Sequence, residues 1–287
     1  MPAFFDLRQF DALLLEALRI FVWLLLLAIV FLPFEHIFAV NQRKLLCRSL
    51  AGDIGFYFIS GLVPSLLLTP LLALAALGAH AVVPWHLQVA VASLPLWARA
   101  VAALLVGEVG FYWGHRWSHQ IPFLWRFHMI HHNPRQLYFL ISARAHPLDN
   151  VFTRLCGLVP IYILGIATPL TPSGGLISAL LVLALTMWGF LIHANLRVRL
   201  GPLEWLIATP AFHHWHHTLA EPRDRNFASM LPVIDWIFGT HYLPRKRWPE
   251  AYGIAGELPA SLAGQLLHPF QLQPPARDVA GSVTAER

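Results

Sequence analysis

The sequence predicts an all-α integral membrane fold, with four or five transmembrane helices and a cytoplasmic helical cap that carries a histidine-rich dimetal site. The first observation is the composition: 57% of the 287 residues are hydrophobic and 12% are charged, whereas a soluble globular domain contains about 25% charged residues. The second is a set of long apolar stretches, and the third is the close spacing of many of the 16 histidines. This composition excludes an ordinary soluble enzyme and a disordered chain.

Five apolar segments approach the length of about 20 residues that a helix needs to cross a bilayer. They cover residues 18–38, 54–77, 94–114, 151–170 and 176–193. The second segment contains Pro64 and Pro70, which predict a kink or two half-helices. The stretch TPLTPSGG between the last two segments predicts a tight turn. Four spans remain the alternative if one segment is re-entrant.

The basic residues predict the orientation in the membrane, because cytoplasmic loops are enriched in Lys and Arg. Nine of them fall in the connections after the first, third and fifth segments: Arg43, Lys44, Arg48, Arg116, Arg126, Arg135, Arg144, Arg197 and Arg199. The connections at 79–93 and 167–175 contain none. We therefore expect a multi-pass protein, in the inner membrane if the source is bacterial, with the N-terminus outside and the histidines facing the cytoplasm.

The remaining sequence features predict one domain and no nucleic-acid partner. The net charge of +5 is not concentrated in a dense basic run, so it does not indicate nucleic-acid binding. Residues 1–270 are expected to form a single membrane-embedded domain, with a histidine-rich core at 105–245. Residues 271–287 are polar and Pro-rich, and we expect a disordered tail.

Ten histidines occur at spacings that suit metal coordination. Those in HRWSH are four residues apart and share a helical face, and FHMIHH and FHHWHH both repeat the i, i+3, i+4 spacing. Thr209 and Pro210 predict the start of a helix at the last of these motifs. The ten are His115, His119, His128, His131, His132, His146, His193, His213, His216 and His217. We expect ordinary structural roles for the other six, His36, His80, His86, His214, His241 and His268.

So many imidazoles at one end of the spans exceed the needs of one tetrahedral zinc ion. They suit two metal ions with four or five nitrogen ligands each. A metal-bound histidine usually donates its second ring N–H to a carboxylate or a carbonyl. Three carboxylates near the motifs are candidates for that role: Glu108 inside the third segment, Asp149 three residues after His146, and Asp235 in VIDWIFGT.

At HRWSH, FHMIHH, AHPLD, IHANL, TPAFHHWHH and DWIFGT the chain resembles the fatty acid hydroxylase and sterol desaturase superfamily of membrane di-iron oxygenases. The resemblance covers about residues 105–245. It implies a helical membrane fold whose histidines gather in a cytoplasmic cap, two iron ions, and dioxygen as co-substrate. It assigns metal ligation to eight histidines of the ten, with His146 and His193 as more variable additional ligands.

The chain also departs from some members of that superfamily. The fatty acid 2-hydroxylases carry a histidine four residues before the position of His193, and Gly189 stands there in this chain. The blocks AHPLD and IHAN look closer to the sterol-modifying and bacterial lipid branches, in which His146 would supply the missing ligand. The chain lacks the HPGG motif of a fused cytochrome domain. Electrons are therefore expected from a separate protein, a reductase, ferredoxin or cytochrome.

The expected activity is hydroxylation of a C–H bond in a membrane lipid, either sterol-like, fatty acyl or of another class. Desaturation at the same centre is the alternative. A membrane zinc hydrolase would carry a glutamate beside a histidine pair, as in HExxH, and none is present. A metal transporter would place metal-binding side chains in the middle of several spans, whereas only Glu108 lies well inside one. Zinc can replace iron in purified protein. The sequence identifies neither the lipid, the substrate-binding residues nor the oligomeric state.

Overall fold

The computed structural model describes residues 7–42, 49–167, 172–245 and 247–271, and these residues are helical or irregular, with no strand. Their only β-type pairing is an isolated bridge between Thr218 and Tyr252. Four helices contain a stretch long and apolar enough to cross a membrane. They are α1 (Leu7–Ile37), α2 (Leu50–Val82), α4 (Leu96–Gln120) and α7 (Pro172–His193).

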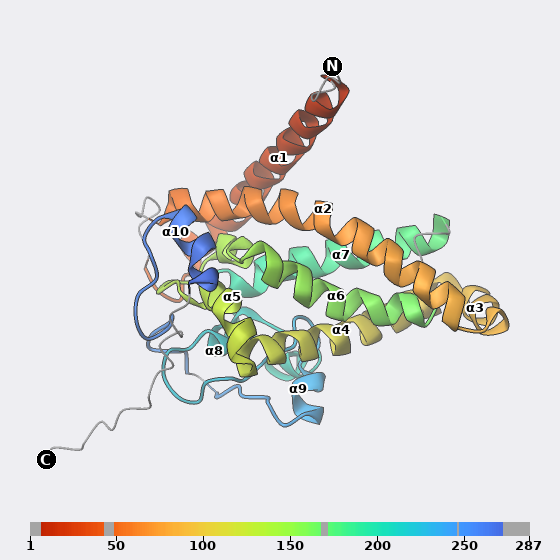
Figure 1. The fold of residues 1–287 in the computed structure, drawn as a ribbon. Coiled ribbons are helices and arrows are strands. Elements are labelled where there is room, and N and C mark those ends of the chain that lie inside the picture. The colour runs from red at the N-terminus through yellow and green to blue at the C-terminus, as the bar shows by residue number, and fades with distance from the viewer. Residues whose placement is uncertain (1–6, 43–48, 168–171, 246, 272–287) are drawn as a thin grey trace, which may run out of the picture.

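A bundle of α2, α4, α7 and the shorter α6 (Pro147–Ile163) forms the body of the molecule (Figure 1). The helix α6 packs mainly against α2 and α4. It lies so close to α4 that a Cβ atom at Gly110 would be 2.1 Å from the carbonyl oxygen of Cys156. Only glycine fits at that crossing. The short helix α3 (Trp85–Ala92) connects α2 to α4 at one end of the bundle, opposite α5 and α8 (Figure 1).

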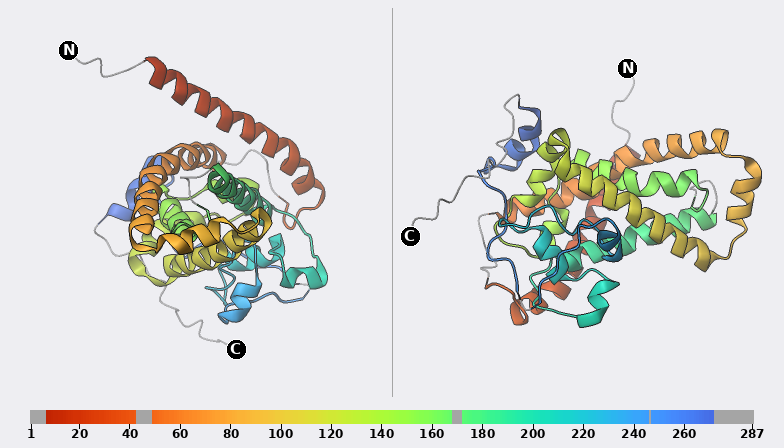
Figure 2. Two further views of the ribbon diagram at one scale, coloured as in Figure 1. Left: turned by 90° about the vertical axis from the view of Figure 1, so that its right-hand side faces the viewer. Right: turned by 90° about the horizontal axis from the view of Figure 1, so that it is seen from below.

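The first helix lies outside this bundle, as the view along the bundle axis shows (Figure 2). Most of its large apolar side chains are exposed, as expected for a helix surrounded by lipid. Its C-terminal end is attached to the rest of the chain by Glu35, whose Oε1 accepts from the backbone N–H groups of Phe139 at 2.7 Å and Asn195 at 2.8 Å. The side chain of Asn195 in turn accepts from the N–H of Val40.

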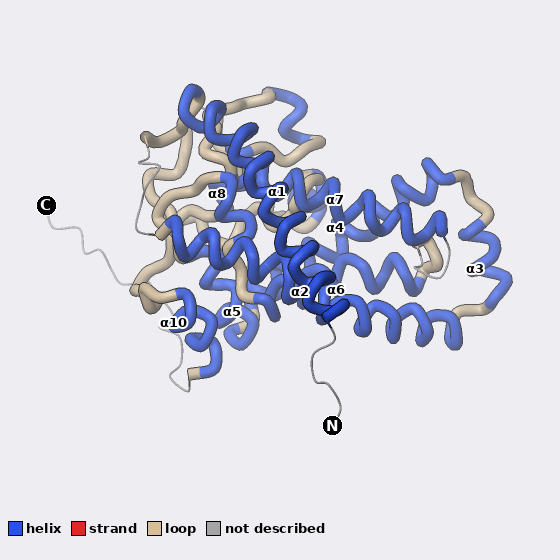
Figure 3. The backbone as a smooth tube through the Cα atoms, turned by 90° about the horizontal axis from the view of Figure 1, so that it is seen from above, coloured by secondary structure: helices blue, strands red, loops and turns tan. Residues whose placement is uncertain are grey.

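The end of the bundle opposite α3 carries a cap of short helices joined by long loops (Figure 3). Its elements are α5 (Pro122–His132), η1 (Phe139–Ala143), η2 (Gly201–Trp205), α8 (Pro210–His216), α9 (Val233–Ile237), α10 (Leu262–Leu267) and η3 (His268–Phe270). The cap buries many polar groups, including most of the clustered histidines. Buried polar groups are costly unless they are paired, so the cap must satisfy them internally.

The structure favours four spans, the lower of the two predicted numbers. The segment predicted at 151–170 forms α6, which is 17 residues long and is not among the four candidate spans. It is held between other helices and carries a buried carboxylate, Asp149. The helix α2 runs through both Pro64 and Pro70 as one element, so the predicted division into half-helices is wrong. Residues 168–171 of the predicted turn and 272–287 of the predicted tail lie outside the described residues.

Candidate metal centre

Nine of the ten predicted histidines meet in two adjacent groups, each of which could hold a metal ion. Within each group the candidate ligand atoms all lie within 4.8 Å of one another. The five-histidine group consists of His115, His119, His128, His132 and His216. The four-histidine group consists of His131, His193, His213 and His217. The helices α4, α5, α7 and α8 supply eight of them, and His217 directly follows α8.

The local sequence explains how each motif reaches these groups. The helix α4 continues to Gln120, so His115 and His119 lie one turn apart on the same face. Each HxxHH motif is divided between the two groups: its i, i+4 pair enters one group and the middle histidine enters the other. In α5 the middle residue is His131, and in α8 it is His216. Thr209 caps α8 by accepting from the N–H of Phe212, as predicted.

Hydrogen bonds fix the tautomer of six of these rings through Nδ1. In the five-histidine group, Nδ1 faces an acceptor in four cases: His115 with Phe227 O at 2.8 Å, His119 with Asp224 Oδ1 at 2.9 Å, His128 with Asp149 Oδ2 at 3.0 Å and His216 with Arg225 O at 2.8 Å. In the four-histidine group, His131 faces Arg144 O at 3.1 Å and His193 faces Gly189 O at 2.6 Å. Each neutral ring that donates from Nδ1 leaves the lone pair on Nε2 bare.

The bare Nε2 atoms converge. In the four-histidine group, His193 Nε2 lies 3.1 Å from that of His131, 2.9 Å from that of His213 and 3.3 Å from that of His217. Four nitrogens around a tetrahedral ion at about 2.1 Å would lie about 3.4 Å apart. Lone pairs that meet this closely repel one another unless a cation lies between them, so this donor set fits a metal ion.

The five-histidine group shows the same signature. The Nε2 atoms of His128 and His132 are 3.1 Å apart. Those of His119 and His216 are buried and have no hydrogen-bond partner within the described residues. Buried polar atoms without a partner are rare and require an explanation. A metal ion would satisfy both atoms at once.

Burial keeps the cap histidines neutral, which metal ligation requires. Desolvation is the largest cause, and it lowers the pKa of five of them well below the ordinary value of 6.5, with the neighbouring imidazoles adding to the shift. These five are His131, His132, His213, His216 and His217. Neutral nitrogen donors suit iron, zinc and copper.

The three predicted carboxylates occupy different positions. Asp149 accepts from His128 Nδ1 and, at 3.3 Å, from the hydroxyl of Ser118. Asp235 is one step further away: it accepts from the N–H of Phe227, whose carbonyl faces His115. Burial raises the pKa of Asp235 to about 6.

Glu108 does not orient a ring through the hydrogen bonds of the structure. Its Oε2 accepts from the backbone N–H groups of Met230 at 2.7 Å and Leu231 at 3.0 Å. The carboxylate therefore attaches the loop before α9 to α4.

His146, also predicted as a ligand, lies in neither group. Its Nδ1 accepts from the N–H of Leu148 at 3.1 Å, so the ring caps the N-terminus of α6, and its Nε2 faces the carbonyl of Leu266 at 3.2 Å. Both ring nitrogens are occupied by these contacts. His214 has the structural role expected of it, since its ring nitrogens face the hydroxyl of Tyr252 and the carbonyl of Ala194.

Sequence reasoning missed several residues that hold the ligands in place. Asp224 faces His119 from a loop 105 residues away in the chain, and no spacing rule could connect them. Asp53 forms a buried ion pair with Arg144, whose carbonyl faces His131. An acidic residue at the start of a membrane helix was the available signal for Asp53, because ionisable groups there are usually functional or paired.

Comparison with known proteins gives a consistent set of matches. The model of the fatty acid hydroxylase family matches residues 100–240. The ornithine lipid hydroxylase OlsE of Rhizobium tropici is 33% identical over 178 residues, which are 61% of this chain and 51% of that protein. Alkylglycerol monooxygenase of Homo sapiens is 31% identical over 140 residues, 48% of this chain and 29% of that protein. Methylsterol monooxygenase 2-2 of Arabidopsis thaliana is 28% identical over 160 residues, 51% of this chain and 55% of that protein.

The chain thus spans about half the length, or less, of these curated relatives. No solved structure matches it. These three relatives are named as a hydroxylase and two monooxygenases, and the region matched by the family model contains every histidine of both groups. Through this region, the chain is similar to the fatty acid hydroxylase family.

Proposed function

We propose that this chain is an oxygen-dependent di-iron monooxygenase that hydroxylates a C–H bond of a membrane lipid. The observation that carries the proposal is the convergence of bare Nε2 atoms in two adjacent groups at one end of four candidate membrane helices. Iron bound by these nitrogens would supply the activation of dioxygen that attack on an unreactive C–H bond requires. Electrons would come from a separate protein, and the cap would face the cytoplasm.

The chain's own residues would hold the ligands rigid and keep water away. The Nδ1 partners fix the planes of six of the nine rings, so much of the ligand geometry is set before any ion binds. Phe227 packs against three rings of the five-histidine group, with ring centroids 5.1 Å from His119 and 5.8 Å from both His115 and His216. An apolar wall of this kind excludes water from the reaction space.

An apolar groove beside the cap supports a lipid as the substrate. It has a volume of about 590 Å³ and runs between α1 and α7. Its lining is Val30, Phe31, Phe34, Ala184, Met187, Trp188, Leu191, Leu196 and Met230. Leu191 and Leu196 lie on either side of His193 in the sequence. A hydrocarbon chain that entered from the bilayer along this groove would extend toward the four-histidine group.

The test compares wild type with His132→Ala and His217→Ala in cells grown under labelled dioxygen, with all membrane lipids analysed by mass spectrometry. We expect one lipid class to gain a single labelled oxygen in wild type and in neither variant. His86→Ala is the matched control, because His86 is exposed and lies outside both groups. Loss of two hydrogens without oxygen gain would identify a desaturase. Unchanged lipids, in membranes that contain metal-loaded protein and a reductant, would refute an oxidative function.

A further inference from the structure

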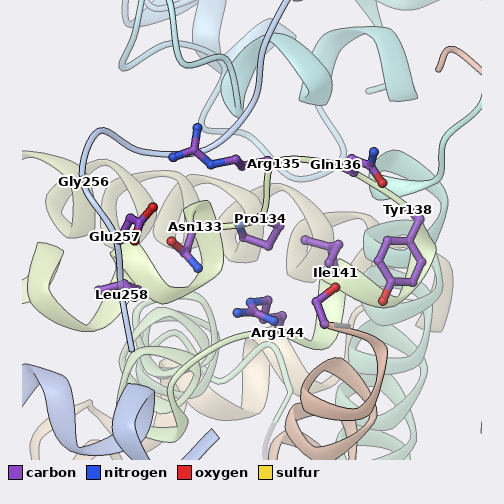
Figure 4. Close-up of a pocket in the computed structure, with 11 residues that line it drawn as sticks. Asn133, Pro134, Arg135, Gln136, Tyr138, Ile141, Arg144, Gly256, Glu257 and Leu258 are labelled. Atoms are coloured by element: carbon purple, nitrogen blue, oxygen red, sulfur yellow. The ribbon is translucent and has the colours of Figure 1, made fainter. Parts of the chain in front are cut away.

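A polar cavity of about 360 Å³ lies beside the metal centre (Figure 4). The loop after α5 forms one side of it, the end of η1 and Arg144 form the floor, and the segment 256–258 forms the opposite side. The lining residues are Ser49, Asn133, Pro134, Arg135, Gln136, Tyr138, Ile141, Arg144, Gly256, Glu257 and Leu258. Its volume is within the usual range for a small-molecule site.

The same stretch of backbone lines the cavity on one side and holds metal-centre histidines on the other. Asn133 directly follows His132, the last residue of α5. Arg144, at the floor of the cavity, provides the carbonyl that His131 Nδ1 faces at 3.1 Å. A molecule in the cavity would therefore lie one layer of chain away from ligands of both histidine groups.

Several polar groups that line the cavity have nothing to bind within the described part of the chain. The side chains of Asn133, Arg135, Gln136 and Glu257 make no hydrogen bond or ion pair there. Arg144 is only 5% exposed, and its Nε is buried without a hydrogen-bond partner. Arg144 is thus held rigidly at the floor of the cavity, and the side chains that a ligand can reach are those of Asn133, Arg135, Gln136 and Glu257.

The charges of the lining indicate what kind of acceptor. The guanidinium of Arg144 is already balanced by Asp53, and its Nη2 donates to Gln265 Oε1 at 2.8 Å. Among the described residues this leaves one unpaired positive charge, on Arg135, and one unpaired negative charge, on Glu257, and both side chains are exposed. A lining with one free charge of each sign complements a zwitterion better than a simple anion or cation.

The position of the cavity indicates a lipid. Ser49 lines it and directly precedes α2, whose N-terminal end is one end of a candidate membrane span. The cavity thus lies at the depth where head groups meet the protein. The cavity lies near the apolar groove: Tyr138 lines the cavity, its neighbour Phe139 stacks on Phe31 at 5.3 Å between centroids, and Phe31 lines the groove.

We propose that this cavity binds the zwitterionic head group of the lipid substrate. An oxyanion, either carboxylate or phosphate, binds Arg135, and a primary ammonium group binds Glu257. This inference rests on the proposed lipid hydroxylation. It assigns substrate selection to the head group as well as to the hydrocarbon chain.

Binding to the purified, metal-loaded full chain tests the proposal without turnover. The probes are dimyristoyl phosphatidylethanolamine and N-myristoyl lysine, which both carry an oxyanion and a primary ammonium, and dimyristoyl phosphatidylglycerol, which lacks the ammonium. We expect the two probes with an ammonium group to bind at least about tenfold more tightly than phosphatidylglycerol, because one charge-assisted hydrogen bond contributes about that much affinity. The stronger of the two identifies phosphate or carboxylate as the oxyanion. Equal binding of phosphatidylglycerol would overturn the proposal, as would binding of free phosphoethanolamine as tight as that of the lipid.

Two pairs of variants locate the site. Arg135→Gln and Glu257→Gln should each weaken binding about tenfold. Arg245→Gln and Glu250→Gln, which change exposed charges of the cap outside the cavity, should leave the binding affinity unchanged.

These four variants, together with wild type and His132→Ala, are then assayed for labelled oxygen in lipid. If oxygen insertion and lipid selectivity persist in Arg135→Gln and Glu257→Gln, the function stands and the head-group site is wrong. If selective binding is found but no lipid gains oxygen in wild type, the proposed function fails and the site stands as a lipid-binding site.

Discussion

The two histidine groups use the same two HxxHH motifs, yet different partners hold their rings. In the five-histidine group two rings face carboxylates, Asp149 and Asp224, and two face carbonyls. In the four-histidine group both partners are carbonyls. The Nδ1 atoms of the other two members, His213 and His217, are buried without a hydrogen-bond partner within the described residues.

This difference indicates that the two sites are chemically unequal. A carboxylate that accepts from Nδ1 makes the opposite nitrogen a stronger donor and fixes the orientation of the ring. The five-histidine group also has one more nitrogen. We therefore expect it to bind its ion more tightly, and the four-histidine group to be the site that exchanges its ion more readily.

Removal of one ligand from either group is the most drastic test of this comparison. His132→Ala and His217→Ala should each lower the metal content from two ions to one per chain and abolish oxygen insertion, because the proposed reaction requires an ion in both groups. The measurements are elemental analysis and labelled oxygen in lipid. Full activity in His217→Ala would show that the four-histidine group is not part of the active centre.

Loss of the buried carboxylate should have the next largest effect. Asp149→Asn preserves the size of the side chain but removes its charge, and we expect metal affinity at the five-histidine group to fall by about 10–100-fold. Competition with a fluorescent chelator measures this affinity. Ser118→Ala, which removes only the hydroxyl that also donates to Asp149, is the matched control and should have a much smaller effect. An equal loss at the four-histidine group would contradict the separation of the two sites.

Chelation of the wild-type protein should proceed in two steps. The four-histidine group lacks carboxylate partners, so its ion should leave about tenfold faster than the other. Release is followed by stopped-flow absorbance with a coloured chelator. One kinetic phase that releases both ions would mean that the two groups behave as a single site.

Asp224→Asn should have the smallest effect of the series. The Asp224 side chain is 61% exposed, whereas that of Asp149 is 6% exposed, and solvent screens its interaction with His119. We expect less than about tenfold loss of affinity at the five-histidine group. Glu221→Gln, at an exposed carboxylate of the same loop, is the control. A larger effect than that of Asp149→Asn would reverse the order of importance of the two carboxylates.

Hydropathy and histidine spacing were sufficient to predict the helical membrane fold and nine of the residues that meet. These signals are local: an apolar run predicts a membrane span, and two histidines at i and i+4 predict a shared helical face. Hydropathy could not distinguish α6 from a span, because burial against α2 and α4 favours the same apolar residues as lipid does.

The signals that failed depend on tertiary contacts. The division of each HxxHH motif between two groups follows from how α5 and α8 face each other, and the motif itself does not contain that information. The sequence around His146 resembles that of a metal ligand, and it does not report that the following Pro147 starts α6, so that His146 caps this helix. The contact between Asp224 and His119 depends on the fold, so the sequence alone could not predict it.

The histidine groups have a mechanical consequence that follows from which helices they join. The four-histidine group draws on α5, α7 and α8, and its contacts connect residues 62 and 20 positions apart, His131 with His193 and His193 with His213. An ion bound there acts as a cross-link that restricts the unfolded chain, much as a disulfide does. Loss of that ion would release the cap from the bundle while the spanning helices stay in the bilayer, so protease resistance of the cap would become a measure of metal occupancy.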